Sequence, residues 1–396
     1  MDNKEYWLSK ISVKKAVLEN GSIRFHLIDE NYDFIKYAKE FIDVICARDG
    51  ANTSQNTLQT YCYNLRHFFV YLYIYNYSVL DTDGKTDVII DYKLWLQNPY
   101  RFYPNIIPFS YNMESKQSED ELSISTQNQY ISTVNTFYVY LAQSGIIKRN
   151  PMPYRNAYLS GNYKDRDMLI HTKRERRIKV NALISKQPKK KVSVISNSDF
   201  KTLLNSVKSL RDKTILLLLK EGGLRAGELL GVHIEDIDFG ECGIWVKFRN
   251  NNSNGSRAKA GYGRDRFVFL MPSLMSLIDE YITSEWIKAD PLEDYLYIVI
   301  NSNKTDENGK PMKNYTLNAI FNYYGKKCII DVHSHMLRHT HATELAQTYI
   351  KNKEPINWKF ISERLGHRSI TTTIDIYAHL ETEDYKQEYE RLYLND

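Results

Sequence analysis

Histidines, arginines and one tyrosine near the end of the chain form a pattern that could do chemistry. His335, Arg338 and His339 stand close together, and His367 and Tyr377 follow them in order. His335 and Arg338 are three positions apart in a segment with a helical pattern, so both side chains project from one face. The residues before Tyr377 are mostly threonine and isoleucine, which predicts an extended or weakly helical segment. A phenol there, beside cationic and proton-handling groups, could attack phosphorus.

Each part of this pattern also has an ordinary structural explanation. A lone His-x-x-Arg pair most often lies on the solvated face of a helix. The functional interpretation therefore depends on the whole set, and on whether an earlier segment supplies a second cation. After an apolar helical run, two glycines precede Arg225 and Glu228, and they let the backbone turn tightly so that Arg225 can point into a cleft. The alternative for this pair is a surface Arg/Glu contact of little energetic consequence.

Taken together and in order, these motifs resemble the signature of the tyrosine recombinases, or phage integrase family. The segments that carry the resemblance are Gly-Leu-Arg225-x-x-Glu228-Leu, His335-x-Leu-Arg338-His339-Thr340, Leu365-Gly366-His367 and Tyr377. The first is similar to the first arginine box of the family, and the others are similar to the second half of its signature.

The resemblance implies DNA cleavage without a metal or any other cofactor. Arg225 and Arg338 would offer forked donors to the non-bridging oxygens of a phosphodiester, a role that suits arginine because it keeps its charge. Tyr377 would be the nucleophile and form a 3′-phosphotyrosyl bond, which keeps the bond energy so that religation needs no ATP. His335 and His367 would orient the phosphate and assist proton transfer at Tyr377.

In this family a catalytic lysine sits on a β-hairpin turn, and the chain has a glycine-rich loop between predicted strands at 243–249 and 266–270. Lys259 is the match in this loop and would be the general acid for the leaving 5′ oxygen. Arg257 and Arg264 compete for that role, and a basic loop in the minor groove is the alternative for all three. Glu228 would support the site by holding a basic group in place.

Length and composition limit the class of protein. A chain of 396 residues is long enough for two or three domains, and its composition is that of a globular protein. The sequence has neither an apolar run that approaches 18 residues nor a signal-peptide core, so we expect a cytoplasmic protein. The four cysteines are far apart, which argues against a metal site and against a disulfide framework and favours buried thiols.

The positive charge is concentrated in one segment. Residues 164–191 contain eleven Lys or Arg and three acidic residues, a balance of +8, whereas the whole chain carries +5. A solvated linker is the ordinary explanation. Between two DNA-binding domains, such a segment would follow the phosphate backbone. The candidate DNA-binding residues are Lys173, Arg174, Arg176, Arg177, Lys189, Lys190 and Lys191, with Arg257 and Arg264 in the later loop.

Hydrophobic periodicity predicts a mainly α fold with a small β-sheet, that is, an α+β protein. The expected parts are an N-terminal arm with a hairpin (1–28), a helical core DNA-binding domain (29–158), a basic interdomain linker (159–192) and a catalytic domain with a C-terminal helix (193–396). The resemblance implies that the helical domain is of the core-binding, SAM-like type and forms a clamp around DNA with the catalytic domain. Polar residues on its helices, among them Asn64, Gln127 and Thr133, suit phosphate and base-edge contacts.

The function that the resemblance implies is site-specific DNA recombination. One chain holds one nucleophile and strand exchange needs four cuts, so we expect a homotetramer on double-stranded DNA, with accessory or DNA-bending proteins, associated with the nucleoid. The chain looks most similar to mobile-element integrases, in particular transposon-encoded integrases of the transposase A type. A chromosome-dimer resolvase, a type IB topoisomerase and a DNA-binding regulator that does not cut DNA are the alternatives.

Overall fold

The computed structural model describes residues 3–18, 23–49, 55–98, 100–103, 121–158, 177–187, 192–249, 252–257, 265–300, 306–377 and 380. It divides into two compact units, Met1–Lys189 and Lys190–Asp396. Helices predominate and the sheets are small, as expected for the α+β class. No helix in the described ranges is long and apolar enough to cross a membrane.

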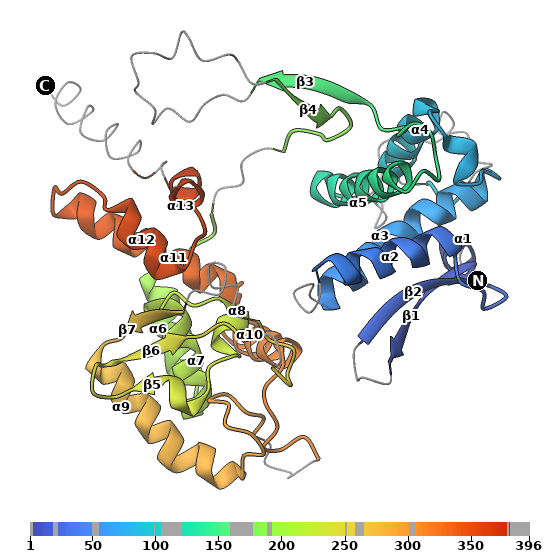
Figure 1. Ribbon diagram of the computed structural model, residues 1–396. Coiled ribbons are helices and arrows are strands. Elements are labelled where there is room, and N and C mark those ends of the chain that lie inside the picture. Colours follow the sequence, from blue (N-terminus) through green and yellow to red (C-terminus); the bar gives the residue numbers. More distant parts are fainter. Residues whose placement is uncertain are drawn as a thin grey trace, which may run out of the picture. The chain divides into compact units, whose positions relative to one another are not determined.

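The first unit begins with a short helix and a hairpin (Figure 1). The expected hairpin consists of strands β1 (Ile11–Val17) and β2 (Ile23–Asp29), and the helix α1 (Asn3–Ser9) before it was not expected. Arg66 attaches this arm to the third helix, because its guanidinium donates to the carbonyls of Leu8 and Ile11, the latter at 2.7 Å. The hairpin is therefore part of the helical unit and contributes to its core.

Four longer helices follow, within the range 29–158 that the sequence predicts to be helical. They are α2 (Lys36–Asp49), α3 (Gln55–Ile74), α4 (Thr86–Gln97) and α5 (Ile124–Gln143). A 3-10 turn, η2 (Leu80–Thr82), precedes α4. The helices bury aromatic rings against each other, for example Phe41 on Phe137 with ring centroids 5.6 Å apart and Phe68 on Tyr138 at 5.7 Å. Such edge-to-face pairs add to the hydrophobic burial of the core.

Three polar side chains on these helices do not face solvent, and the prediction that they suit DNA contacts was wrong. Asn64 donates to Thr133 Oγ1 at 2.8 Å, and this hydrogen bond joins α3 to α5 inside the unit. Gln127 is also buried and accepts a hydrogen bond from Lys93 Nζ at 2.9 Å. Buried polar groups need such partners, so these residues serve the core.

A second hairpin, β3 (Tyr154–Tyr158) with β4 (Arg177–Asn181), ends the first unit. Part of the segment predicted to be a linker (159–192) is therefore the strand β4, and the backbone of Arg177 belongs to this strand. The other candidate DNA-binding residues of this segment, Lys173, Arg174, Arg176, Lys189, Lys190 and Lys191, lie outside the described residues.

The second unit starts with two capped helices, α6 (Asn197–Ser206) and α7 (Leu210–Glu221). Ser196 and Ser209 accept hydrogen bonds from the first-turn backbone N–H groups of Asp199 and Asp212, as N-cap serines do. A three-stranded antiparallel sheet follows the short helix α8 (Ala226–Leu229) and the turn η5 (Ile234–Asp236). Its strands are β5 (Ile237–Asp238), β6 (Gly243–Val246) and β7 (Arg266–Phe269), hydrogen-bonded in that order.

Helices complete the second unit. They are α9 (Pro272–Tyr281) continued by the π-helical segment η7 (Ile282–Trp286) and the 3-10 segment η8 (Ile287–Ala289), α10 (Asn314–Cys328), α11 (Ser334–Lys351), α12 (Trp358–Leu365) and α13 (Ile370–Tyr377). The main core gathers α6, α7, α9, α10 and the inner face of the sheet. A smaller core joins α11, α12 and α13.

The structure decides the conformation of the segment before Tyr377 and the burial of the four cysteines. Tyr377 ends a regular helix, α13, so the segment takes the helical of the two conformations expected for it, although its β-branched neighbours favour extended structure locally. Burial of Thr373, Tyr377 and Leu380 against α11 and α12 outweighs that preference. All four cysteines are free thiols, but only Cys46 and Cys62 are buried, whereas Cys242 and Cys328 are partly exposed. The expected C-terminal helix lies outside the described residues, apart from Leu380.

Candidate functional site

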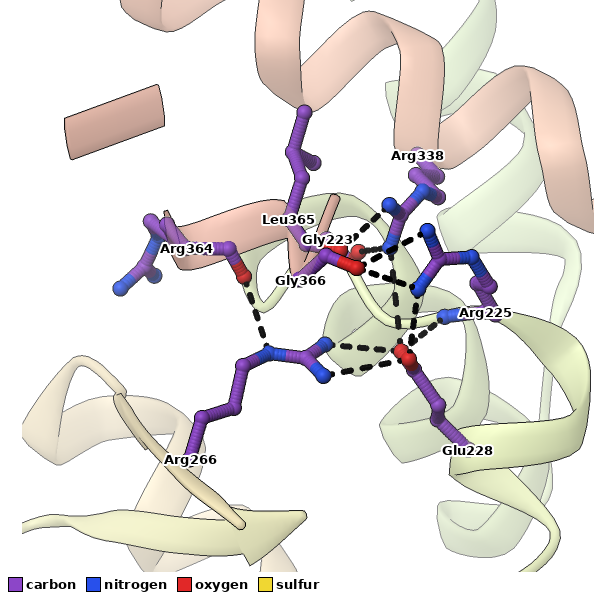
Figure 2. A network of polar contacts seen from close by, with 8 residues as sticks. All are labelled: Gly223, Arg225, Glu228, Arg266, Arg338, Arg364, Leu365 and Gly366. Carbon is purple, nitrogen blue, oxygen red and sulfur yellow. Dashed lines mark hydrogen bonds and ion pairs between the residues drawn. The ribbon is translucent and has the colours of Figure 1, made fainter. Parts of the chain in front are cut away.

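Gly223, in the turn between α7 and α8, contacts Arg338 just before Arg225. Gly223 has a φ of +63°, and a Cβ there would lie 2.5 Å from Cδ2 of His341. Its carbonyl accepts a hydrogen bond from Arg338 Nη1 at 2.6 Å (Figure 2). Arg225, two residues further on, is the N-cap of α8. Glycine is required here because only a residue without a side chain tolerates both the left-handed backbone and the contact with His341.

The carboxylate of Glu228 lies at the centre of three guanidinium groups (Figure 2). Arg266 donates hydrogen bonds to both carboxylate oxygens, at 3.1 and 2.8 Å. Arg225 donates through Nη1 at 2.8 Å and through its backbone N–H at 2.9 Å. Arg338 Nη1 lies 3.7 Å from the carboxylate. The side chain is fully buried. Burial alone raises the pKa of Glu228, but the hydrogen bonds and charges of the three arginines outweigh it and hold the pKa at about 2. Glu228 is therefore charged at neutral pH.

The end of helix α12 provides further acceptors for both arginines. Arg338 Nη2 donates to the carbonyl of Leu365 at 2.5 Å, and Arg225 donates to the carbonyl of Gly366 at 3.1 and 3.2 Å. Gly366 caps the helix with a φ of +61°. The last carbonyls of a helix lack partners within it and carry partial negative charge, so they bind cations. The Leu-Gly pair before His367 thus helps to fix Arg225 and Arg338.

Two further arginines belong to this network, and the sequence analysis missed them. Arg266 begins β7, and its Nε donates to the carbonyl of Arg364 at 3.2 Å. Arg364, in α12, donates to His341 Nε2 at 2.9 Å and to the carbonyls of Glu221 and Phe269. In the sequence, Arg266 stands at the start of the predicted strand that follows the glycine-rich loop, and this position was the only indication that it could lie near the site.

The nucleophile candidate contacts a histidine that the sequence analysis did not assign a role. His339 Nδ1 and Tyr377 Oη are 2.5 Å apart, and the tyrosine side chain is 1% exposed. The ring of His335, one turn earlier on α11, packs against the ring of His339 with centroids 4.3 Å apart. His367 Nδ1 forms a hydrogen bond with Thr373 Oγ1 at 2.8 Å.

Charge in the site comes from arginine, because the histidines are neutral at pH 7. Burial is the main cause that lowers the pKa of all three histidines, and positively charged neighbours lower it further. The pKa of His335 is lowered, that of His339 is about 4 and that of His367 is about 3. Burial also lowers the pKa of Arg338 to about 9, so it stays charged. Burial raises the pKa of Tyr377 well above its usual value, and the charge of Arg338 opposes this rise. One carboxylate among three guanidinium groups leaves an excess of positive charge, which suits an anion such as phosphate.

The structure thus brings together Arg225, Glu228, His335, Arg338, His367 and Tyr377. Lys259 and Arg264 lie outside the described residues. Arg257 is described, and its backbone carbonyl lies against Gly227, within helix α8. In the described ranges, no group of three His, Cys, Asp or Glu side chains is arranged to hold a metal ion.

Comparison with known proteins adds independent information. Residues 193–384 match the model of the phage integrase family. Over 383 residues the chain is 30% identical to transposase A from transposon Tn554 of Staphylococcus aureus, which covers 96% of this chain and 98% of the relative. It is 32% identical over 212 residues to tyrosine recombinase XerA of Saccharolobus solfataricus, with 54% of this chain and 60% of the relative covered.

The fold is also similar to that of a solved structure. The Tn1549 transposon integrase in complex with transposon right end DNA aligns with a TM-score of 0.55 at 18% identity, over 89% of this chain and 98% of that chain. At this level of identity the likeness concerns the fold.

Proposed function

Because this chain belongs to the phage integrase family of tyrosine recombinases and is a site-specific DNA recombinase, we propose that it is the integrase or transposase of a mobile genetic element. It cleaves and rejoins double-stranded DNA through a 3′-phosphotyrosyl intermediate. The observation that carries this proposal is the grouping of Arg225 and Arg338 around one carboxylate, next to the buried hydroxyl of Tyr377.

Arg225 and Arg338 bind the scissile phosphate in this proposal. A guanidinium has five N–H donors, and the hydrogen bonds to Glu228, Gly223, Leu365 and Gly366 occupy only some of them. The remaining donors are free to bind the non-bridging oxygens as charge develops on a five-coordinate phosphorus. Glu228 keeps both arginines in place before DNA binds, whereas the buried hydroxyl of Tyr377 must become accessible to the phosphate.

Tyr377 supplies the nucleophile. Its Oη forms a bond to phosphorus while the bond to the 5′ oxygen breaks, and the phosphotyrosyl link keeps the energy for religation. The proposed general acid is Lys259, two residues after Arg257, whose carbonyl lies against Gly227. His335 and His367 orient the phosphate. The reaction requires neither a metal ion nor ATP, because arginine side chains carry the positive charge and the covalent link stores the energy.

Recombination requires an assembly larger than one chain. Four strand cuts and one tyrosine per chain lead to a homotetramer on two DNA sites, with accessory or DNA-bending proteins as further partners. The basic residues of segment 164–191, with Arg257 and Arg264, contact the phosphate backbone in this proposal. Such a protein works in the cytoplasm, on the nucleoid when it is bound to DNA.

The test uses a nicked duplex that carries the DNA flanking the gene, since the ends of a mobile element are candidate sites. Wild type and Tyr377→Phe are incubated with it in EDTA without ATP, and denaturing gels report covalent protein–DNA complexes. We expect an SDS-resistant complex with wild type and none with Tyr377→Phe. A complex with both proteins would exclude Tyr377 as the nucleophile. Binding without a complex on a tiled set of flanking fragments would overturn the catalytic assignment.

A further inference from the structure

We propose that His339 is a further catalytic residue of this site, which holds the hydroxyl of Tyr377 before cleavage and accepts its proton as Oη attacks phosphorus. This inference rests on the proposed function, in which Tyr377 is the nucleophile. It assigns the proton transfer to one atom, Nδ1 of His339, whereas the sequence analysis assigned it to His335 and His367.

The geometry gives His339 direct access to the reacting atom. Its Nδ1 lies 2.5 Å from Tyr377 Oη, within the distance that a general base needs. His339 follows Arg338 on α11, so one helix carries both the phosphate-binding cation and the group that contacts the nucleophile. The ring of His335 packs edge-on against the ring of His339, at an angle of 68°, and restrains its orientation. The two rings are thus fixed before DNA arrives.

The other two histidines contact different groups. His367 Nδ1 pairs with Thr373 Oγ1, and His335 contacts the ring of His339. Neither contact places a ring nitrogen of these residues on Tyr377 Oη. They therefore remain candidates for orienting the phosphate.

The protonation states agree with this direction of transfer. Burial raises the pKa of Tyr377, so the phenol keeps its proton at pH 7 and donates it in the hydrogen bond. Burial keeps His339 unprotonated, so Nδ1 is the acceptor and the ring proton is on Nε2. Tyr377 is 1% exposed, and the imidazole of His339 is the base in direct contact with its hydroxyl.

Atoms and protons balance in both directions. During cleavage, Oη bonds to phosphorus, its proton moves to Nδ1 of His339, and the departing 5′ oxygen takes a proton from the general acid. During religation, the 5′ hydroxyl attacks, the bond between Oη and phosphorus breaks, and His339 returns its proton to Oη. The positive charge of Arg338 disfavours an imidazolium at His339, and the negative charge of the bound phosphodiester offsets this effect. Among the residues that the structure describes, the charged or titratable groups that interact with His339 are His333, His335, Arg338, His367 and Tyr377.

A single-turnover cleavage assay on the nicked duplex tests this assignment, with Tyr377→Phe as the control for the proposed function. The first variant is His339→Asn, because an Asn oxygen can stand near the position of Nδ1 and accept the hydrogen bond but is not a base. We expect DNA affinity to be unchanged and formation of the covalent complex to slow by about 100-fold, the lower range for loss of a general base. Between pH 6 and 9 the variant should accelerate more steeply than wild type, as hydroxide replaces the missing base.

A matched control and a second variant separate catalysis from folding. His233→Asn changes another histidine that packs against a tyrosine in the same unit, Tyr295, and should cleave at the wild-type rate. His339→Ala should regain part of its activity when imidazole is added, whereas His233→Asn should not respond. Wild-type rates and pH dependence in His339→Asn, or no response of His339→Ala to imidazole, would overturn the proposal. A wild type without any covalent complex would instead overturn the proposed function, and the inference with it.

Discussion

A single carboxylate organises the charges of the candidate site. Glu228 is fully buried and contacts Arg225, Arg266 and Arg338, which come from α8, β7 and α11. The sequence indicated the pair Arg225 and Glu228, three positions apart, but left open whether it was a surface contact. Burial decides the matter, because a carboxylate inside the protein is tolerable only when cationic groups contact it, as the three arginines do.

Removing the charge of Glu228 should destabilise the second unit in a pH-dependent way. The pKa of Glu228 falls from 4.5 to about 2 on folding, so its ionised form contributes about 3 kcal/mol of stability above pH 5. This contribution decreases as the pH falls from about 5 to 2, because the unfolded chain then binds the proton first. Glu228→Gln should therefore be less stable than wild type at pH 7, and the difference should shrink at pH 3.

Urea unfolding followed by tryptophan fluorescence measures this difference, since Trp245, Trp286 and Trp358 lie in the second unit. Glu363→Gln, an exposed helical glutamate with a weak pairing to Lys359 at 3.9 Å, is the control and should change stability by less than about 1 kcal/mol. A pH-independent difference for Glu228→Gln would contradict the low pKa of this carboxyl.

At the scale of elements, the C-terminus of α12 is the point where segments distant in sequence meet. Its last carbonyls accept from Arg225 and Arg338, and Gly366 lies against the guanidinium of Arg266. The helix itself was not predicted, because the sequence analysis considered Leu365-Gly366-His367 only as a motif. The structure gives the glycine a physical reason: it ends the helix in a left-handed conformation and leaves room for Arg266.

Gly366→Ala should weaken both stability and cleavage. The left-handed backbone costs a residue with a side chain about 1 to 2 kcal/mol, and the new Cβ would lie 2.6 Å from Arg266 Nη1. Displacing Arg266 disturbs its bonds to Glu228, so covalent complex formation should fall as well. Gly255→Ala is the matched control, since Gly255 has a φ of +72° with nothing within 4 Å. It should show the backbone cost alone, measured by urea unfolding, and equal cleavage rates in the two variants would contradict the steric argument.

The hydrogen bond between Asn64 and Thr133 joins α3 to α5 in the first unit, and it gives a second prediction at this scale. Thr133→Val leaves the buried amide of Asn64 without its partner and should cost about 1 to 3 kcal/mol. The double variant Asn64→Leu with Thr133→Val should recover part of this loss, because both polar groups are then gone. Urea unfolding of the two single variants and the double variant gives the coupling energy. If the losses of stability in the two single variants simply added in the double variant, the hydrogen bond would not couple the two residues. A drop in DNA affinity without a loss of stability would indicate that Asn64 and Thr133 face solvent and contact DNA.

For the whole molecule, charge is distributed unevenly along the chain. The segment 164–191 carries +8 of a chain whose total is +5, and the boundary between the two compact units falls inside it. Part of the segment is strand β4. Non-specific attraction to DNA should therefore depend on this segment more than on the net charge.

Replacing Lys189, Lys190 and Lys191 by Gln should make DNA binding less sensitive to salt. Each lost phosphate contact reduces the slope of log affinity against log salt concentration by about 0.9, so three contacts give a change of about 2.7. Fluorescence anisotropy over a salt series measures the slope. A control with the same charge change replaces Lys39, Lys310 and Lys359, each of which pairs with a nearby carboxylate. If the two triple variants showed equal slopes, net charge rather than this segment would govern binding.

The sequence by itself determined which residues are available for chemistry and where most helices lie. Motif order and hydrophobic periodicity are properties of short stretches, so they indicated Arg225, His335, Arg338, His367 and Tyr377, and the four long helices of the first unit. The same locality explains the errors. Asn64 and Thr133 have the composition of a polar surface, although both are buried in the core.

Only the tertiary structure decided which groups meet. Arg225 reaches the carbonyl of Gly366 across 141 positions, Arg266 reaches Glu228 across 38, and His339 reaches Tyr377 across 38. No local pattern encodes such contacts, because they depend on how the cores of the second unit bring α8, β7, α11, α12 and α13 together. The residue types therefore determine which chemistry the site can do, whereas the contact between His339 and Tyr377 results from the packing of the helices.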